Sequence, residues 1–265
     1  MAVGDLLKRP VPAKQLERCD AVVNCAARVH VTRDRTSDPE AAYRAMNSDV
    51  AIQLLKAAAE AGAKRFVQLS SVAALAARTP PGMLVDDSAE PHPQTPYGRS
   101  KLLADERLAE ESANLGVKVV SLRPPAVIGP VAPAHLRLLM RCAKAGIPLP
   151  IGGVDNRRTF MFVDNVADAV LAAASGGPAG CFIITDSPPI STATLYRALL
   201  RLCGHSQRLP SLPLPFLRLV GRALLGGRVE SIVGNAAFDG SRFSRLFDWT
   251  PPVDFETALE LTVGR

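Results

Sequence analysis

Cysteine and histidine are scarce in this sequence, and neither residue type is arranged as a metal site requires. The five cysteines contain no C-x-x-C pair, and the four histidines have no metal-ligand spacing. An odd, unclustered set of thiols is typical of buried free cysteines in a reducing compartment. We therefore expect a cytoplasmic protein with free thiols and no metal site.

Long apolar runs are also missing. The opening residues, MAVGDLLKRPVP, lack the apolar core of a signal peptide. The most apolar later stretch, residues 212–225, is interrupted by prolines, arginines and a glycine and is too short to span a bilayer. We expect no transmembrane segment. An ordinary core helix is the favoured interpretation of residues 212–225, and a basic amphipathic surface helix is the alternative.

The charge balance is basic but does not indicate nucleic acid. The net charge is +6 and the pI is about 9.3. The basic residues are scattered, and no basic cluster interleaved with aromatics occurs. An excess of this size instead favours an anionic small ligand such as a nucleotide diphosphate. The length of 265 residues suits one large domain, or one domain with a lobe.

Residues 65–71 and 95–101, RFVQLSS and TPYGRSK, carry a pattern suited to proton transfer. Residues 65–69 predict a buried strand that ends at Ser70 and Ser71, and Pro96 predicts the start of a helix. On that helix Tyr97 and Lys101 share one face. A cation beside a phenol lowers its pKa, which is otherwise near ~10. Taken alone, the pair fits a surface tyrosine and a solvated lysine about equally well.

These motifs together resemble those of a known family, the extended short-chain dehydrogenase/reductases, particularly the nucleotide-sugar epimerases and 4-keto reductases. By that resemblance Ser71, Tyr97 and Lys101 match the catalytic Ser/Thr, Tyr and Lys. The resemblance extends from residue 3 to about residue 260. Three further stretches of the sequence are most similar to the bacterial surface-polysaccharide branch of this family: NCAARVHVTRD, NRRTFMFVDN and DWTPP.

The resemblance implies an α/β fold, a Rossmann-like doubly wound parallel sheet with a smaller C-terminal substrate lobe. The sheet domain would comprise residues 1–128 and 160–188. The lobe would comprise residues 129–159 and 189–265. Residues 39–61, which are rich in alanine, predict one long helix on their own pattern.

A dinucleotide, NAD or NADP, is the implied cofactor. Small residues at the end of the strand predicted within residues 19–27 would let a ligand approach the backbone, although a tight strand–loop corner explains them too. In the family an asparagine at the position of Asn47, inside the 39–61 helix, helps hold the cofactor side of the site, and a partner-bonded or solvated side chain explains this asparagine about equally well. The family's cofactor residues correspond to Asp5, Leu6, Asn24, Ala26, Ala27, Asn47, Tyr97, Lys101 and Pro124.

A nucleotide sugar is the implied substrate, with contacts from Ser71, Ala126 and Arg158. Arginine forks match phosphate oxygens, and the doubled arginine at 157–158 precedes a predicted strand. A structural ion pair with a neighbouring acid is the alternative for Arg158. Epimerases of the family often carry Asn where Ala126 stands, so epimerase and reductase both stay open. So does a homodimer.

One family element is missing. The family begins with a Gly-x-x-Gly-x-x-Gly loop whose amides hold the pyrophosphate, and no such spacing occurs in the 265 residues. We expect an N-terminally truncated sheet lacking about two strand–helix units, roughly 60 residues. A late start of the reading frame, a genuine truncation and an unexpected fold of the first residues are the three explanations.

The expected function is an NAD(P)-dependent reaction at C4 of a UDP-hexose, as an epimerase or a 4-keto reductase. One alternative is a non-catalytic binding or scaffold protein derived from a dehydrogenase. Another is a reductase of a non-nucleotide alcohol or ketone, against which the arginine pair argues.

Overall fold

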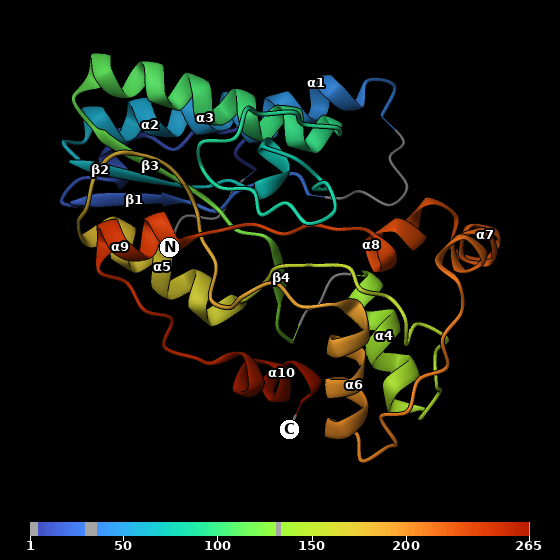
Figure 1. Cartoon of the computed structure of the whole chain (residues 1–265). Coiled ribbons are helices and arrows are strands. Elements are labelled where there is room, and N and C mark those ends of the chain that lie inside the picture. The colour runs from blue at the N-terminus through green and yellow to red at the C-terminus, as the bar shows by residue number, and fades with distance from the viewer. Residues whose placement is uncertain (1–4, 30–35, 131–133, 265) are drawn as a thin grey trace.

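The computed structural model describes residues 5–29, 36–130 and 134–264 (Figure 1). Its centre is a four-stranded parallel sheet in the order β1-β2-β3-β6. The strands are β1 Ala21–Asn24, β2 Arg65–Leu69, β3 Lys118–Arg123 and β6 Gly180–Ile183. The expected parallel α/β class is confirmed. Within the described residues β1 pairs only with β2 and forms one edge of the sheet.

Helices cover both faces of this sheet, as the doubly wound prediction requires (Figure 1). One face carries α1 Pro39–Arg44, α2 Val50–Glu60 and α3 Pro96–Leu115, and the other carries α5 Val163–Ser175 and α9 Ser241–Phe247. Buried strand residues such as Phe66 and Val67 face opposite layers, one under α2 and the other under α5 and α9. The sheet is therefore apolar on both sides, as is typical of parallel sheets.

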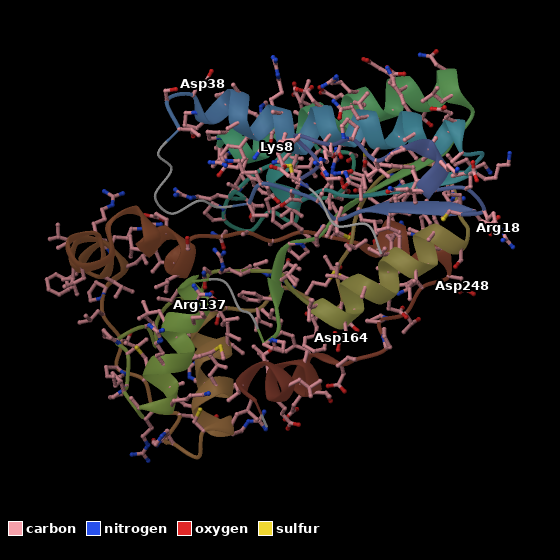
Figure 2. All side chains as sticks on the ribbon, turned by 180° about the vertical axis from the view of Figure 1, so that it is seen from behind. Lys8, Arg18, Asp38, Arg137, Asp164 and Asp248 are labelled. Atoms are coloured by element: carbon pink, nitrogen blue, oxygen red, sulfur yellow. The ribbon has the colours of Figure 1, made fainter. Side chains whose placement is uncertain are left out.

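The helix predicted over residues 39–61 is continuous in space but not uniform. A π-helical turn, Ala45–Asp49, separates α1 from α2. Asp38, at the start of α1 in Figure 2, accepts a hydrogen bond from the amide of Ala41 and caps the helix. The helix expected over residues 39–61 is therefore observed, with a π turn in its middle that the sequence did not predict. Asn47 lies within this turn and is fully buried.

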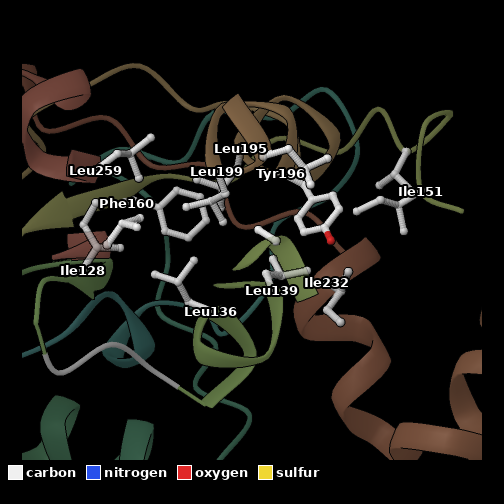
Figure 3. Packing of buried hydrophobic residues seen from close by; sticks show 14 of the residues in the cluster. Ile128, Leu136, Leu139, Ile151, Phe160, Leu195, Tyr196, Leu199, Ile232 and Leu259 are labelled. Atoms are coloured by element: carbon white, nitrogen blue, oxygen red, sulfur yellow. The ribbon is translucent and has the colours of Figure 1, made fainter. Parts of the chain in front are cut away.

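The remaining elements form a second layer built around a short parallel pair, β4 Ala126–Ile128 and β5 Phe160–Phe162. Its helices are α4 Ala134–Lys144, α6 Thr192–Leu202, α7 Leu214–Leu225, α8 Glu230–Val233 and α10 Phe255–Val263. Figure 3 shows their shared core, in which Phe160 packs with Leu136, Leu199 and Leu259. The Tyr196 hydroxyl donates a hydrogen bond to the carbonyl oxygen of Ile147 at an O···O distance of 2.6 Å, which is within the usual range for a hydroxyl donor.

The segment after α8 returns to the sheet. Phe243 of α9 and Trp249 belong to the buried cluster that includes Val67 and Leu122 of the central strands. The Trp249 indole donates to Asp168 of α5 at 2.7 Å. Trp249 is thus a packing anchor, and residues 241–249 lie against the sheet rather than within the α4–α6–α10 core.

Two expectations about exposure were wrong. The helix α7 is not a core helix, because Leu219 and Leu224 are 68% and 78% exposed. The cysteines are free but not buried, since Cys19 and Cys25 are exposed and the other three are half-buried. Among the described residues, no helix is both long and apolar enough to cross a bilayer.

Candidate active site

The carboxyl ends of β2 and β3 face the first turn of α3, and the three expected side chains meet there. Thr95 caps α3 by accepting a hydrogen bond from the amide of Gly98 at 3.0 Å, and Pro96 occupies the first helical position. Ser71 caps the short 3₁₀ turn Val72–Ala74 that follows β2. These two local caps set the directions in which Ser71 and Tyr97 leave the backbone.

Ser71 and Tyr97 are hydrogen-bonded through their side chains. The ammonium of Lys101 lies 5.9 Å from the centre of the Tyr97 ring, on the ring's face. Lys101 is 1% exposed and donates to the backbone carbonyl of Leu69 at 2.8 Å. The structure therefore brings together the serine, tyrosine and lysine that the sequence singled out.

Burial dominates the electrostatics of the cluster. It raises the pKa of Tyr97, while the hydrogen bond from Ser71 works in the opposite direction. Burial also lowers the pKa of Lys101 to about 8, although Asp105 partly offsets this by its negative charge. Both groups are thereby pushed toward their neutral forms. The expected lowering of the tyrosine pKa by the lysine is not what this arrangement gives.

Gly98 permits the close contact between the helix and the serine turn. A Cβ atom at this position would lie 2.3 Å from the carbonyl oxygen of Ala73, which is a backbone atom and cannot rotate away. Only glycine allows α3 to approach the 72–74 turn this closely. The glycine beside Tyr97 is therefore a determinant of the Ser71–Tyr97 contact, and one that sequence reasoning missed.

A buried polar network supports the cluster from behind. Asp105 lies one helical turn beyond Lys101, and its Oδ2 accepts hydrogen bonds from the Ser70 hydroxyl and from the Nε of Arg123, both at 2.9 Å. The Arg123 and Asp105 side chains are 7% and 1% exposed. The adjacent serines are thus divided: Ser70 joins this network and Ser71 faces Tyr97. The i, i+4 spacing of Lys101 and Asp105 was the signal that could have found Asp105.

Residues at the end of β1 use their polar groups on one another. Asn24 donates to the side chain of Gln68 at 2.8 Å and accepts from the amide of Ala26 at 3.0 Å. Ala26 and Ala27 follow, and both are half-buried. Asn24 therefore shapes the strand–loop corner with its side chain, which supports the tight-corner interpretation and leaves the two alanines as the surface that a ligand could approach.

Asn47 ties this corner to the tyrosine helix. Its Oδ1 accepts from the amide of Arg28 at 2.7 Å, and its Nδ2 donates to the carbonyl of Arg28 at 3.1 Å and to the hydroxyl of Ser100 at 2.9 Å. Both Nδ2 protons and one acceptor site of Oδ1 are thereby used within the protein. The side chain is therefore bonded within the protein, and its part on the cofactor side stays a prediction.

The other expected cofactor and substrate positions are more scattered. The carbonyl of Pro124 accepts from the amide of Val72 and links the end of β3 to the serine turn. Ala126 lies half-buried in β4 opposite Phe160. Asp5 and Leu6 lie in a local turn in which Asp5 accepts from the amide of Leu7 and pairs with Lys8. Residues 3 and 4, where the family resemblance begins, lie outside the described residues.

Arg158 is a poorly neutralised cation. Its backbone bridges Ile190 and Ala236, and its Nη1 donates to the carbonyl of Gly234 at 3.1 Å. Its Nε has no hydrogen-bond partner in the described part of the chain. Burial, followed by the charge of Arg78, lowers the pKa of Arg158 to about 10. The ion pair with an acid, which was the alternative for this arginine, does not occur among the described ion pairs.

The loop after Ser71 connects this cation to the tyrosine site. The amide of Thr79 donates to the carbonyl of Asn235, and the hydroxyl of Thr79 accepts from the amide of Ala237. Arg78 is thereby held beside the segment that pairs with Arg158. The segment that begins at Arg78 therefore links the tyrosine site to the surroundings of Arg158.

The fold and the site define a class of protein: a parallel α/β chain with a serine, a tyrosine and a buried lysine at the carboxyl ends of its strands. Comparisons with known proteins narrow this class. Residues 1–180 match the model of the NAD dependent epimerase/dehydratase family. The UDP-glucose 4-epimerase of Vibrio cholerae is 30% identical over 266 aligned positions, which cover 98% of this chain and 80% of that protein.

Solved structures agree with this match. The enzyme WbmG of Bordetella bronchiseptica, in complex with NAD and UDP, has a TM-score of 0.70 and 25% identity, covering 98% of this chain and 77% of that one. The UDP-N-acetylglucosamine 4-epimerase of Methanobrevibacter ruminantium, in complex with UDP-N-acetylmuramic acid, shares the fold at a TM-score of 0.77 and 20% identity, covering 98% and 81%.

The chain belongs to the NAD dependent epimerase/dehydratase family. It is an enzyme of the NAD-dependent oxidoreductase and isomerase type, related to nucleotide-sugar epimerases. The expected family resemblance is confirmed.

Proposed function

We propose that this enzyme transfers a proton and a hydride at C4 of a UDP-hexose, as an epimerase or a 4-keto reductase. The observation that carries the proposal is the hydrogen bond between Ser71 and Tyr97, with the Lys101 ammonium 5.9 Å from the tyrosine ring. A hydroxyl bonded to a phenol, with a cation over the phenol ring, forms a general acid–base set for an alcohol.

The residues present fit a dinucleotide, NAD or NADP. Lys101 uses one donor on Leu69, and an ammonium has three. Two small residues, Ala26 and Ala27, leave the carboxyl end of β1 open to a ligand. Lys101, Tyr97, the two alanines and Pro124 would hold the cofactor, while Asn24 and Asn47 would act by fixing the loop. Asp5 and Leu6 remain predictions that no contact in the structure supports.

Each side chain of the cluster has a definite part in the step. Tyr97 accepts the proton of the C4 hydroxyl as phenolate, a form that burial disfavours and the hydrogen bond from Ser71 favours. Ser71 donates a hydrogen bond to the same oxygen, and the Lys101 ammonium over the ring would add to the stabilisation of the phenolate charge. A nicotinamide held here would supply the hydride acceptor for C4 oxidation; return of the hydride to the opposite face would make the enzyme an epimerase, and delivery to a 4-keto sugar alone would make it a reductase.

Arg158 supports the choice of a nucleotide-linked substrate. A half-buried arginine whose Nε is buried and has no partner in the described part of the chain, next to the cation Arg78, favours a bound anion. The WbmG complex holds UDP as well as NAD. We assign the diphosphate to Arg158 and place the sugar between it and Tyr97, beside Ala126.

The predicted division of labour between the two layers is also part of the proposal. Residues 1–128 and 160–188 would bind the dinucleotide, and residues 129–159 and 189–265 the sugar nucleotide. In this scheme the loop that contains Arg78 and Thr79 joins the two functions, because it starts at Ser71 and ends against Asn235 and Ala237.

A binding titration followed by an activity assay tests the proposal. The purified chain is titrated with NADH, with nicotinamide fluorescence as the signal, in the presence and absence of UDP-glucose. We expect saturable binding, and C4 epimerisation or 4-keto reduction that falls at least 100-fold in Tyr97→Phe. Tyr196→Phe is the matched control, since its hydroxyl bonds only Ile147 in the α4–α6 core.

Two results would overturn the proposal. Absence of NADH binding would support the scaffold alternative. Binding with equal activity in wild type and Tyr97→Phe would remove the tyrosine from the chemistry.

A further inference from the structure

The helix α7, Leu214–Leu225, has its apolar side turned outward. Its contact with the body is made by Leu217, which is buried, and by Gly221, whose Cβ position would lie 2.3 Å from a methyl of Val229. The stripe of the helix beside this contact, formed by residues 216, 219, 220, 223 and 224 at i, i+3 and i+4 spacing, is apolar at every position. Its large side chains and their exposed fractions are Phe216 51%, Leu219 68%, Val220 37% and Leu224 78%.

The position of α7 in the molecule matches this exposure. In Figure 1 the helix lies at the outer edge of the molecule beside α8, and in Figure 2, seen from behind, it again lies at the edge with side chains directed away from the body. A water-soluble surface helix normally shows polar residues on its outer side. A contiguous apolar surface of this kind marks an interaction site.

Charge around the apolar face has one sign. Residues 201–229 contain five arginines and no aspartate or glutamate. Arg218 and Arg222 flank the apolar face, and both approach the same carboxylate, that of Glu230, at 3.5 and 3.7 Å. Glu230 is mostly buried, with a side chain 13% exposed, so two exposed cations share one partly covered anion and leave a net positive rim.

We propose that α7 docks on the surface of an anionic lipid membrane and lies in the interface with Phe216, Leu219 and Leu224 among the acyl chains. Apolar residues on one side with arginines at the flank are the combination that binds anionic lipid interfaces. This inference does not rest on the proposed reaction.

A second copy of the chain fits this surface less well. A two-fold dimer through α7 would place like patches against each other. Arg218 and Arg222 of one protomer would then lie near the same arginines of its partner, with one carboxylate, that of Glu230, already shared between the two on each protomer. An anionic lipid surface satisfies both the apolar face and the cationic rim.

Sedimentation with vesicles tests the proposal on the full chain. The probes are vesicles of phosphatidylcholine alone and vesicles in which about a third of the lipid is phosphatidylglycerol. The second composition gives a strongly anionic surface. We expect tighter partitioning onto the anionic vesicles, reduced by salt. Leu219→Ser/Leu224→Ser should lower the partition coefficient at least roughly tenfold, and Arg222→Gln should lower it on anionic vesicles only.

Controls come from exposed residues of the same type elsewhere. Leu171→Ser/Leu246→Ser removes two exposed leucines from α5 and α9, and Arg245→Gln removes an exposed arginine from α9. Both should bind vesicles like wild type. Equal sedimentation with both vesicle types, or unchanged binding of Leu219→Ser/Leu224→Ser, would overturn the proposal. So would a dimer in light scattering that this double variant dissociates, because the occupant would then be a second copy.

Discussion

Lys101 donates a hydrogen bond across 2.8 Å from its buried ammonium to the backbone carbonyl of Leu69. Leu69 is the last residue of β2, and Lys101 lies in the second turn of α3. The bond therefore joins the end of a central strand to the helix that carries Tyr97. It fixes the spacing between the strand end that leads to Ser71 and the helix that carries Tyr97. The donor is a charged ammonium, and burial disfavours that charge.

The cost of that charge gives a first prediction. The pKa of Lys101 is about 8 in the folded chain against 10.5 ordinarily, so the penalty is fully present below pH 8 and disappears as the pH rises toward 10.5. Lys101→Met should therefore lose activity yet unfold with a free energy about 1–3 kcal/mol above wild type at pH 7. Urea unfolding at pH 7 and pH 10 measures this, and the gap should narrow at pH 10. A variant less stable than wild type at pH 7 would contradict it.

The buried pair of Asp105 and Arg123 gives a second prediction. Asp105→Asn leaves Arg123 buried without a charged partner and should lower the free energy of unfolding by about 3–5 kcal/mol. Adding Arg123→Met should restore part of the loss, because the uncompensated charge is then gone. A double-mutant cycle by urea denaturation measures the coupling. The exposed pair of Arg201 and Glu256 is the control, and Glu256→Gln should change stability by less than about 1 kcal/mol. Additive effects in the buried pair would show that no such coupling exists.

Gly98 gives a third prediction. Gly98→Ala places a methyl group against the carbonyl of Ala73, so α3 must move away from the serine turn. We expect a loss of about 1–3 kcal/mol in stability together with a fall in kcat, since the Ser71–Tyr97 contact lengthens. Gly227→Ala is the control, because its Cβ position is open. Normal kcat in Gly98→Ala would mean that the contact tolerates the shift.

Arg158 gives a fourth prediction, which concerns binding. Arg158→Gln should weaken UDP binding roughly tenfold to a hundredfold, as expected for a lost charge-assisted hydrogen bond. Arg157→Gln is the control, because the Arg157 side chain is exposed and the bond of this residue to Asn235 comes from its backbone amide. This variant should bind UDP within about twofold of wild type. Calorimetric titration with UDP measures both. Equal loss in the two variants would indicate a general charge effect instead of a site.

Much of this architecture was predictable from local patterns. The apolar run 65–69 gave a strand observed at Arg65–Leu69, and the proline before Tyr97 marked the start of a helix observed at Pro96–Leu115. These elements are specified by short-range rules, namely strand burial and helix capping. Because Tyr97 and Lys101 are one turn apart on that helix, their proximity followed as soon as the helix was recognised.

Other features depend on contacts between distant segments and could not be predicted in this way. The close approach of Gly98 to Ala73 requires the helix and the turn to be placed in space. The raised pKa of Tyr97 depends on how deeply the packed helix buries the ring. The outward apolar side of α7 has the same periodicity that a core helix would have, and the periodicity does not say which side is covered.

The π-helical turn Ala45–Asp49 has a consequence for insertions and deletions in this helix. A π turn holds one residue more than an α turn, and a single residue corresponds to a rotation of about 100° in the helix that follows. Upstream of the turn, Tyr43 meets the ring of Tyr97 edge to face, while downstream Leu55 and Ala58 are packed under the sheet. The extra residue therefore sets the rotation of α2 about the helix axis relative to α1, so that Tyr43 contacts Tyr97 while Leu55 and Ala58 face the sheet. Deleting one residue of this turn would rotate α2 by about 100° relative to α1, so that either the core contacts of α2 or the contact of Tyr43 with Tyr97 would be lost.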